Sequence, residues 1–258
     1  MKLAYSEQGE RSAPPLILIH AFPVHRLMWK QQMEGLSARY RVLAPDLPGF
    51  GESALLEKSP TISAYVDTLL EFMDQMNIPK AVFGGCSMGG YYIFDLWRRF
   101  PDKISAICLC DTRAEADTPE LKERRANTIE LVRAQGLSPL AETLIPQLLC
   151  NETREKHPDR VEEIRKQIYS NPVDGIIHSL IALAARMDST DTLKTITVPT
   201  LVLVGQEDVI TPPVVAHSLQ ANIPNAHLTI IPAAGHLSPF EQPEKVNKEI
   251  HCFLGVMK

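Results

Sequence analysis

Hydrophobic and polar positions alternate along the chain in two distinct patterns. Short, nearly continuous apolar runs, such as 16–19 and 200–204, have the length and composition of buried strands. Between them lie longer stretches, such as 61–76, in which apolar residues recur every three or four positions, as on one face of a helix. Because strands that are apolar throughout must be covered on both faces, this alternation predicts an α/β fold with a mostly parallel central sheet flanked by helices.

The same pattern places the individual elements of this fold. Strands are expected at 16–19, 41–44, 81–83, 104–109, 200–204 and 228–231. Helices are expected at 27–39, 61–76, 88–100 and about 239–254, with a further one that opens at Thr211–Pro212. The carboxyl ends of these parallel strands should share one edge of the sheet, which is where ligands bind in such folds.

Residues 112–191 interrupt the alternation, because strand-like runs are absent there. Instead, a proline stands near the start of four helical segments, at Thr118–Pro119, Ser138–Pro139, His157–Pro158 and Asn171–Pro172. The pattern predicts an all-helical cap at 112–191, inserted after the sixth strand of a core that comprises 1–111 and 192–258. We expect most apolar cap positions to serve in packing and a few to line a cavity below. These positions include Leu144, Leu148, Ile176, Ile177, Leu180 and Leu183.

Charge and composition exclude several classes of partner. The chain of 258 residues carries a formal net charge of −5 and has no basic run longer than 122–125, so we expect no nucleic-acid partner. It begins without the apolar segment of a signal peptide, and no apolar stretch reaches the length of a bilayer span. We therefore expect a soluble, cytoplasmic protein with no membrane partner. Free, mostly buried thiols and no zinc site are expected from the five cysteines, Cys86, Cys108, Cys110, Cys150 and Cys252.

Ser87 is the candidate nucleophile, because it ends the apolar run that starts at Ala81 and lies between Gly85 and Gly89. A strand that turns directly into a helix forces the turning residue to a strained, positive φ and exposes its side chain at the strand end. The two glycines supply the room for that turn. A Gly-x-Ser-x-Gly pattern arises by chance in about one chain in ten of this length, so its context has to decide.

A serine hydroxyl needs a base during attack, and histidine is the side chain suited to take its proton. His236 follows the last strand and a glycine-containing loop, so we expect it at the same sheet edge as Ser87. We expect structural or solvated roles for His157, His178, His217, His227 and His251.

The base in turn needs a carboxylate that holds its orientation. Asp208 follows the penultimate strand and is the leading candidate for this acid, because it gives the chain order Ser, Asp, His. Asp111, at the end of the strand 104–109, is its rival, and Glu207 is a lesser option.

Further motifs carry a family resemblance. The segments Gly85–Gly89, His20–Pro23, Asp46–Ser53, Asp208 within 205–212 and His236 within Ala-Gly-His occur in this order. With them the sequence resembles the α/β-hydrolase superfamily along nearly its whole length. It is most similar to the small, capped esterase and lactonase group that includes the 3-oxoadipate enol-lactonases and the cofactor-free haloperoxidases.

The resemblance implies a serine hydrolase that cleaves a small carboxylic ester or lactone through an acyl-enzyme intermediate, without metal or organic cofactor. Ser87, Asp208 and His236 would form its catalytic triad, and the backbone N–H groups of Phe22 and Met88 would form the oxyanion hole. The sequence departs from the commoner His-Gly-Phe-Pro at one position, because Ala21 replaces the glycine.

Alternative activities stay open at this point. A 3-oxoadipate enol-lactonase would need a cationic cap residue near Ser87, for which Arg113, Arg133 and Arg186 are available. A cofactor-free perhydrolase would use peroxide in place of water, and a small-molecule receptor on the same fold would bind its ligand without steady turnover. The aromatic residues that follow the serine, including Tyr91, could wall an acyl pocket. Because most such aromatic clusters belong to the core, we assign them no role in the site.

Overall fold

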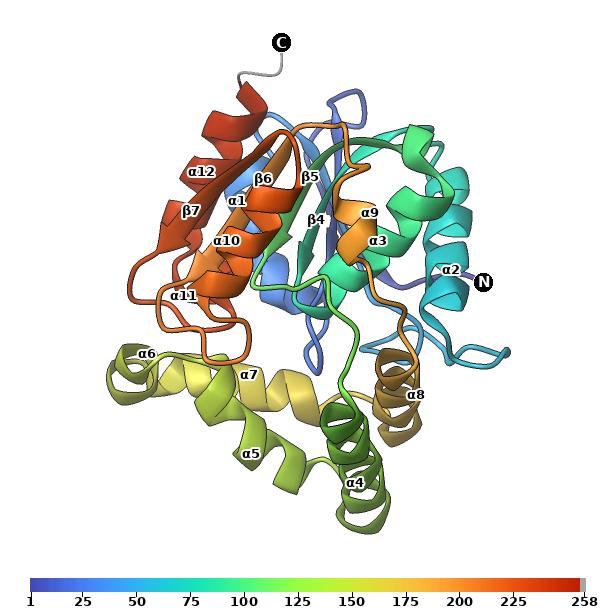
Figure 1. The fold of residues 1–258 in the computed structure, drawn as a ribbon, viewed down its shortest axis with the longest axis vertical. Coiled ribbons are helices and arrows are strands. Elements are labelled where there is room, and N and C mark those ends of the chain that lie inside the picture. Colours follow the sequence, from blue (N-terminus) through green and yellow to red (C-terminus); the bar gives the residue numbers. More distant parts are fainter. Residues whose placement is uncertain (256–258) are drawn as a thin grey trace.

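The computed structural model describes residues 1–255 and contains one seven-stranded sheet in the order β1-β3-β2-β4-β5-β6-β7 (Figure 1). The strands are β1 (Tyr5–Gln8), β2 (Pro15–Ile19), β3 (Arg41–Pro45), β4 (Ala81–Cys86), β5 (Ile104–Cys110), β6 (Thr200–Gly205) and β7 (Ala226–Ile231). Neighbouring strands pair in parallel, except that β1 runs antiparallel to β3. The prediction of a mostly parallel α/β sheet is confirmed.

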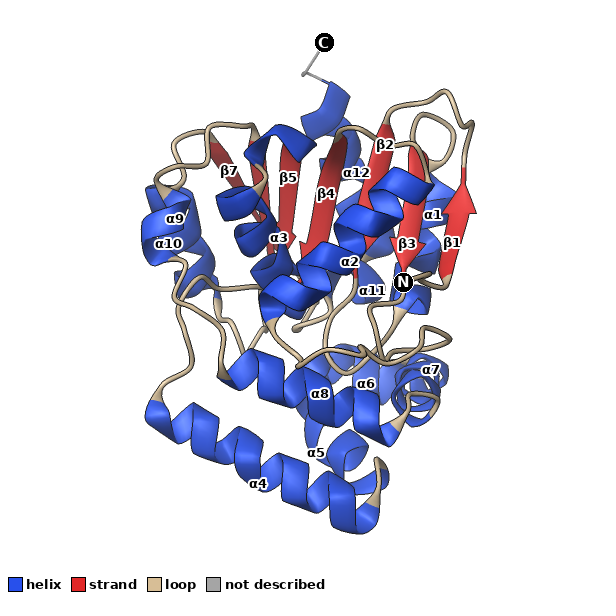
Figure 2. Ribbon diagram, turned by 90° about the vertical axis from the view of Figure 1, so that its right-hand side faces the viewer, coloured by secondary structure: helices blue, strands red, loops and turns tan. Residues whose placement is uncertain are grey.

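Helices cover both faces of this sheet (Figure 2). On one face lie α2 (Ile62–Gln75), α3 (Met88–Arg99), α9 (Thr190–Leu193) and α10 (Pro213–Asn222), and on the other lie α1 (Lys30–Leu36), α11 (Ser238–Glu241) and α12 (Pro243–Gly255). Two 3-10 turns, η1 (Arg26–Trp29) and η2 (Pro101–Lys103), connect some of these elements. Every residue of β3, β4 and β6 is buried, which explains why these strands are apolar except for Arg41 and Thr200 at their starts.

Strand β1 was not anticipated by the sequence pattern, because Tyr5–Gln8 is a short, polar edge strand with no buried residue. It is the only strand that precedes β2 in the described chain, so five strands come before the cap. The expectation that the cap follows the sixth strand is therefore wrong, since it follows the fifth strand, β5.

Two predicted helices are shorter than expected. The segment predicted as 27–39 begins as the 3-10 turn η1 and continues as α1 only to Leu36. The final helix is divided into α11 and α12 at Gln242, which has φ −129° and ψ 59°. Pro243 follows, and a residue before proline avoids helical geometry because the proline ring crowds its backbone.

Five helices lie beyond the carboxyl ends of the parallel strands (Figures 1 and 2). They are α4 (Pro119–Gln135), α5 (Ser138–Leu148), α6 (Asn151–Lys156), α7 (Pro158–Tyr169) and α8 (Val173–Ala184). Four of them start at or beside the prolines that mark them in the sequence. Helix α6 has no such proline, and its first turn is capped instead by Cys150 Sγ, which accepts from the Thr153 N–H at 3.5 Å. A cysteine cap is not a usual sequence signal.

Hydrogen bonds hold these helices over the edge of the sheet. Asn171, just before α8, donates from Nδ2 to the Pro23 carbonyl at 2.7 Å and accepts from the Gly51 N–H at 2.8 Å. At the other end of the layer, the Leu237 N–H donates to the Leu148 carbonyl at 3.1 Å. The helical layer is thus tied to three separate loops of the core.

All five cysteines are free, and four of them are buried while Cys252 is exposed, which confirms the expectation of free, mostly buried thiols. Across residues 1–255, no helix is both long and apolar enough to cross a lipid bilayer. The same residues contain no group of three or more His, Cys, Asp or Glu side chains that could hold a metal ion.

Candidate active site

Ser87 occupies the sharp turn between β4 and α3. Its φ of 51° and ψ of −109° confirm the strained, positive-φ geometry predicted for this position. The turn is held from both sides, because the Ser87 N–H donates to the Cys110 carbonyl at 2.8 Å and Thr112 Oγ1 donates to the Ser87 carbonyl at 2.7 Å. The end of β5 therefore fixes the backbone that presents this serine.

The flanking glycines allow β4 and α3 to come unusually close. A Cβ on Gly85 would lie 2.6 Å from the backbone carbon of Gly89. A Cβ on Gly89 would lie 2.4 Å from the carbonyl oxygen of Ile19 on the neighbouring strand β2. Both positions therefore require glycine for close approach, as the sequence pattern predicts.

The structure brings together Ser87, His236 and Asp208, which lie up to 149 positions apart in the chain. His236 Nε2 lies 2.7 Å from Ser87 Oγ, and His236 Nδ1 lies 2.9 Å from Asp208 Oδ2. His236 follows β7 and Asp208 follows β6, so both reach the sheet edge at which Ser87 follows β4. All three side chains are buried, with Ser87 the most accessible at 9%.

Asp208 is held as an ionised acceptor. Its Oδ1 accepts from the N–H groups of Ile210 and Thr211 at 2.8 and 2.9 Å, and its Oδ2 accepts from Thr211 Oγ1 at 2.6 Å. Burial works to raise the pKa of Asp208, but the neighbouring His236 and these donors keep its pKa below the ordinary value. Because the carboxylate can only accept, the His236 proton lies on Nδ1, which leaves Nε2 to accept the Ser87 hydroxyl proton.

Thr211 is a site residue that sequence reasoning did not identify. Its Oγ1 lies 3.3 Å from His236 Nδ1 as well as 2.6 Å from Asp208 Oδ2. The signal was the Thr-Pro pair that begins three residues after Asp208. In the sequence this pair marks a helix start and supports Asp208 as the acid, but it assigns no role to the Thr211 hydroxyl. A hydroxyl in this position fixes the orientation of the carboxylate toward the ring.

The rival acid Asp111 lies nearby without a hydrogen bond to His236. It is fully buried, has a φ of 49°, and accepts from the Gly205 N–H at 2.8 Å and from Ser238 Oγ at 2.6 Å. Burial, together with the neighbouring charge of Asp208, raises the pKa of Asp111 well above its usual range. Its hydrogen bonds tie the end of β5 to the end of β6 and to the start of α11. The third option, Glu207, is exposed.

Phe22 and Met88, whose backbone amides are the predicted oxyanion donors, both border the cavity that contains Ser87. Within residues 1–255 neither amide donates to a protein acceptor, and the Met88 amide starts helix α3. Two free donors beside a serine hydroxyl are suited to an anionic oxygen. Ala21 has no positive φ, so alanine replaces the expected glycine without backbone strain.

His20 braces the loop that carries Phe22. Its Nε2 accepts from the Leu47 N–H at 3.1 Å and its Nδ1 donates to the Ala21 carbonyl at 3.0 Å, which requires a neutral ring. The ring also packs edge-on against Phe50, with centroids 4.7 Å apart. Burial lowers the pKa of His20 to about 4, against an opposing influence of Asp46.

This low pKa predicts a pH-dependent stability. The unfolded chain binds a proton on His20 near pH 6.5, and the folded chain does so only near pH 4. The stability that the neutral, buried His20 provides is therefore fully present above pH 6.5 and is lost as the pH falls toward 4. Between these values the free energy of unfolding should decrease by about 3 kcal/mol through this residue. Urea unfolding of the wild type and His20→Gln at several pH values should show a shallower dependence in the variant. Equal slopes would contradict the prediction, because all other titrating groups are shared.

The cavity at Ser87 has a volume of about 210 Å³ and lies between the sheet edge and the cap helices. Four of the six apolar cap positions considered in the sequence border it, namely Leu144, Leu148, Leu180 and Leu183. Two arginines of α4, Arg124 and Arg125, border it as well.

The three arginines proposed from the sequence do not border this cavity. Arg113 donates to the Ile210 carbonyl, Arg133 pairs with Glu130 on the exposed side of α4, and Arg186 pairs with the buried Asp117. The cationic side of the cavity therefore comes from Arg124 and Arg125.

Comparisons with known proteins agree with this geometry. A family described as the alpha/beta hydrolase fold matches residues 14–243. The chain is 29% identical over 256 residues to 3-oxoadipate enol-lactonase 2 of Acinetobacter baylyi, covering 99% of this chain and 93% of that protein.

Two solved structures resemble this one closely. The malate-bound thermophilic esterase of Thermogutta terrifontis is 43% identical with a TM-score of 0.94, covering 98% of this chain and 92% of that chain. The enol-lactonase of Burkholderia xenovorans LB400 is 30% identical with a TM-score of 0.91, covering 98% of this chain and 96% of that chain. The resemblance inferred from the motifs around Ser87, Asp208 and His236 is confirmed, and the chain belongs to the family of proteins with the alpha/beta hydrolase fold.

Proposed function

We propose that the protein is a carboxylic ester hydrolase that cleaves a small ester or lactone through an acyl-enzyme intermediate on Ser87. The observation that carries the proposal is the unbroken chain of hydrogen bonds from Asp208 through His236 to Ser87 Oγ, at 2.9 and 2.7 Å. This arrangement is the one by which a serine is activated for acyl transfer. The similarity to an esterase and to enol-lactonases supports the same class of substrate.

In the first half of the reaction, Ser87 Oγ attacks the carbonyl carbon of the ester while His236 Nε2 takes the hydroxyl proton. Asp208 stabilises the imidazolium that forms. The carbonyl oxygen becomes an oxyanion and accepts hydrogen bonds from the amides of Phe22 and Met88. When the tetrahedral intermediate collapses, the bond to the alcohol oxygen breaks, and that oxygen takes the proton from His236.

In the second half, water attacks the carbonyl carbon of the Ser87 ester while His236 takes one of its protons. The same two amides stabilise the second oxyanion. Collapse breaks the bond to Ser87 Oγ, which regains its proton from His236, and the carboxylic acid is released. For a lactone, acid and alcohol are ends of one molecule, so the product is a single ring-opened acid.

A panel of p-nitrophenyl esters and lactones tests this proposal. The expected result is turnover of short acyl esters with an initial burst of p-nitrophenol, and a mass increase of one acyl group on the peptide that contains Ser87. Absence of both turnover and acylation would contradict the proposal. Faster formation of peracid with hydrogen peroxide than of acid with water would indicate a perhydrolase. A single labelling event without turnover would indicate a small-molecule receptor.

A substrate that carries a second, free carboxylate is favoured by the two arginines of α4. Arg125 is committed to an ion pair with the buried Asp117. Arg124 is exposed and has no ion-pair partner among residues 1–255, so its guanidinium is available to an anionic group in the cavity. The similar Acinetobacter baylyi protein is named an enol-lactonase of 3-oxoadipate, an acid of this kind.

Replacing Arg124 with alanine should therefore raise KM for a half-ester of a dicarboxylic acid by about fivefold, the range of an exposed ion pair. KM for the neutral diester of the same acid should change little. The matched control is Arg133→Ala, because Arg133 lies on the same helix but does not border the cavity. Equal effects of the two variants, or of Arg124→Ala on both substrates, would contradict the prediction, and steady-state kinetics measure both.

A further inference from the structure

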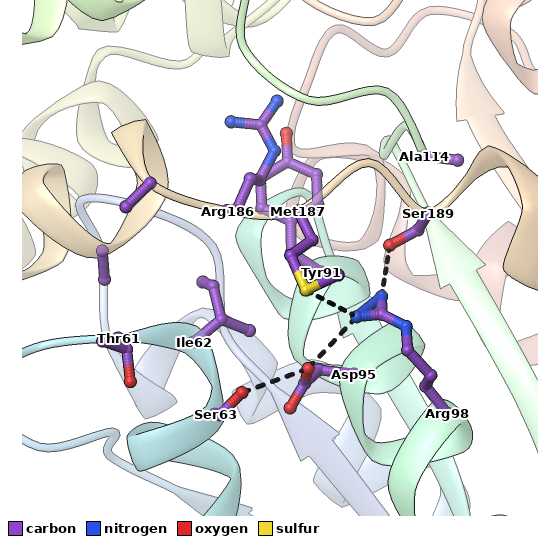
Figure 3. A pocket seen from close by; sticks show the side chains of 12 residues that line it. Thr61, Ile62, Ser63, Tyr91, Asp95, Arg98, Ala114, Arg186, Met187 and Ser189 are labelled. Atoms are coloured by element: carbon purple, nitrogen blue, oxygen red, sulfur yellow. Dashed lines mark hydrogen bonds and ion pairs between the residues drawn. The ribbon is translucent and has the colours of Figure 1, made fainter.

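A second cavity, of about 180 Å³, lies between the start of α2, helix α3 and the segment that follows α8 (Figure 3). Of the described residues, Tyr91 is the one that borders both this cavity and the cavity at Ser87. Tyr91 lies on α3 four positions after Ser87. Residues four apart on a helix share one face, so the ring stands one turn beyond the serine, at the boundary between the two cavities.

The Tyr91 ring is held in this place by Arg186. The guanidinium carbon of Arg186 lies over the ring, 4.4 Å from its centroid (Figure 3). Arg186 is itself buried and donates to Asp117 at 2.5 Å, to the Leu183 carbonyl at 3.0 Å and to the Glu115 carbonyl at 2.9 Å. A cation fixed at three points restrains the ring that it covers, so the partition between the cavities is a built feature of the fold.

The walls of the second cavity combine apolar side chains with polar and charged groups. Ile62, Ala182 and Met187 contribute apolar surface. The charged groups in its lining already have partners, because Arg98 donates to Asp95 at 3.3 Å and to Ser189 at 2.9 Å (Figure 3), and Arg186 pairs with Asp117. An apolar chain that entered would therefore displace water without leaving a buried charge unpaired.

We propose that Tyr91 determines the chain length of the substrate by closing the Ser87 cavity at this end, and that the second cavity becomes a subsite for the apolar chain of an ester when the ring is absent. The inference rests on the proposed ester hydrolase activity. Because each methylene moved from water into an apolar site increases transition-state binding by up to about fourfold, opening the partition should favour long chains over short ones.

The test compares kcat/KM for butanoate and octanoate p-nitrophenyl esters, and for ethyl and octyl acetates, so that either side of the ester carries the chain. Tyr91→Ala should raise the long-to-short ratio by about tenfold or more in one of the two series. Tyr91→Leu keeps apolar packing on α3 and should give a smaller rise, which preserves the test if the alanine variant is unstable. The matched control is Tyr169→Ala, which removes an exposed tyrosine that borders neither cavity and should keep the wild-type ratio.

A folded Tyr91 variant whose ratio stays within twofold of the wild type in both series would overturn the inference. If the wild type hydrolyses none of these esters, the proposed activity fails separately. The inference is then decided by calorimetric Kd values for octanoate and butanoate. Tyr91→Ala should raise the ratio of the butanoate Kd to the octanoate Kd by about tenfold over the wild type. An unchanged ratio would overturn the inference.

Discussion

Ser87→Ala should lower kcat for ester hydrolysis by about 10⁶-fold, the effect of removing the nucleophile from a serine, histidine and aspartate assembly. Within the described chain, His236 Nε2 bonds to no hydroxyl other than that of Ser87, so no neighbouring group can take over the attack. The turn itself should persist, because its hydrogen bonds to Cys110 and Thr112 are made by the backbone of residue 87. Steady-state assays with p-nitrophenyl butanoate and a thermal melting curve measure the two quantities.

The matched control for this variant is Ser218→Ala, which removes an exposed serine on α10, far along the chain from the site. It should keep wild-type kcat and melting temperature. More than about 1% residual activity in Ser87→Ala would show that a different group attacks the ester, because the remaining oxyanion donors and binding contacts accelerate the reaction only modestly on their own.

Residues that directly follow parallel strands could be located from sequence, and this explains why the core of the site was predictable. Ser87, Asp208 and His236 each come shortly after an apolar run, and the runs pair in parallel, so their carboxyl ends meet. The choice between Asp208 and Asp111 was not predictable in the same way. Asp111 follows β5 and Asp208 follows β6, and these strands are neighbours in the sheet. Only the geometry of the loops brings Asp208 to His236.

The cap could be predicted as helical, but the orientation of its helices could not. Helix α4 buries a single residue, Val132, and is charged along most of its length. Without an apolar stripe, its sequence does not indicate which face turns toward the core. The sequence could offer Arg113, Arg133 and Arg186 but not place them, and the structure shows Arg124 and Arg125 at the cavity instead.

Tyr91 illustrates a related limit within a well-predicted helix. Its neighbour Tyr92 is fully buried in the core, as expected, whereas Tyr91 is half-buried between two cavities. Consecutive helical residues point about 100° apart, and the Tyr91 ring is held at the cavity boundary by Arg186, which is distant in sequence. A local aromatic pattern contains no information about such a partner.

Asp208→Asn should lower kcat by about 10⁴-fold, because an amide in place of the carboxylate favours the wrong tautomer of the histidine and no longer stabilises its charged form. Asp208 Oδ1 accepts from the backbone N–H groups of Ile210 and Thr211, so an asparagine oxygen in the same place can still accept from both and the loop should stay folded. The loss should appear in kcat with little change of melting temperature.

Asp111→Asn should instead lower the stability of the protein more than its kcat. Asp111 accepts from Gly205 and Ser238 and makes no hydrogen bond to His236, so an amide nitrogen there would face a backbone donor. We expect a loss of stability of about 1 to 3 kcal/mol, the cost of an unsatisfied buried polar group, and a much smaller loss of kcat than in Asp208→Asn. If both variants fold and Asp111→Asn loses more kcat, the acid that serves His236 is Asp111. The hydrogen-bonded pair at 2.9 Å would then not be the one used in catalysis.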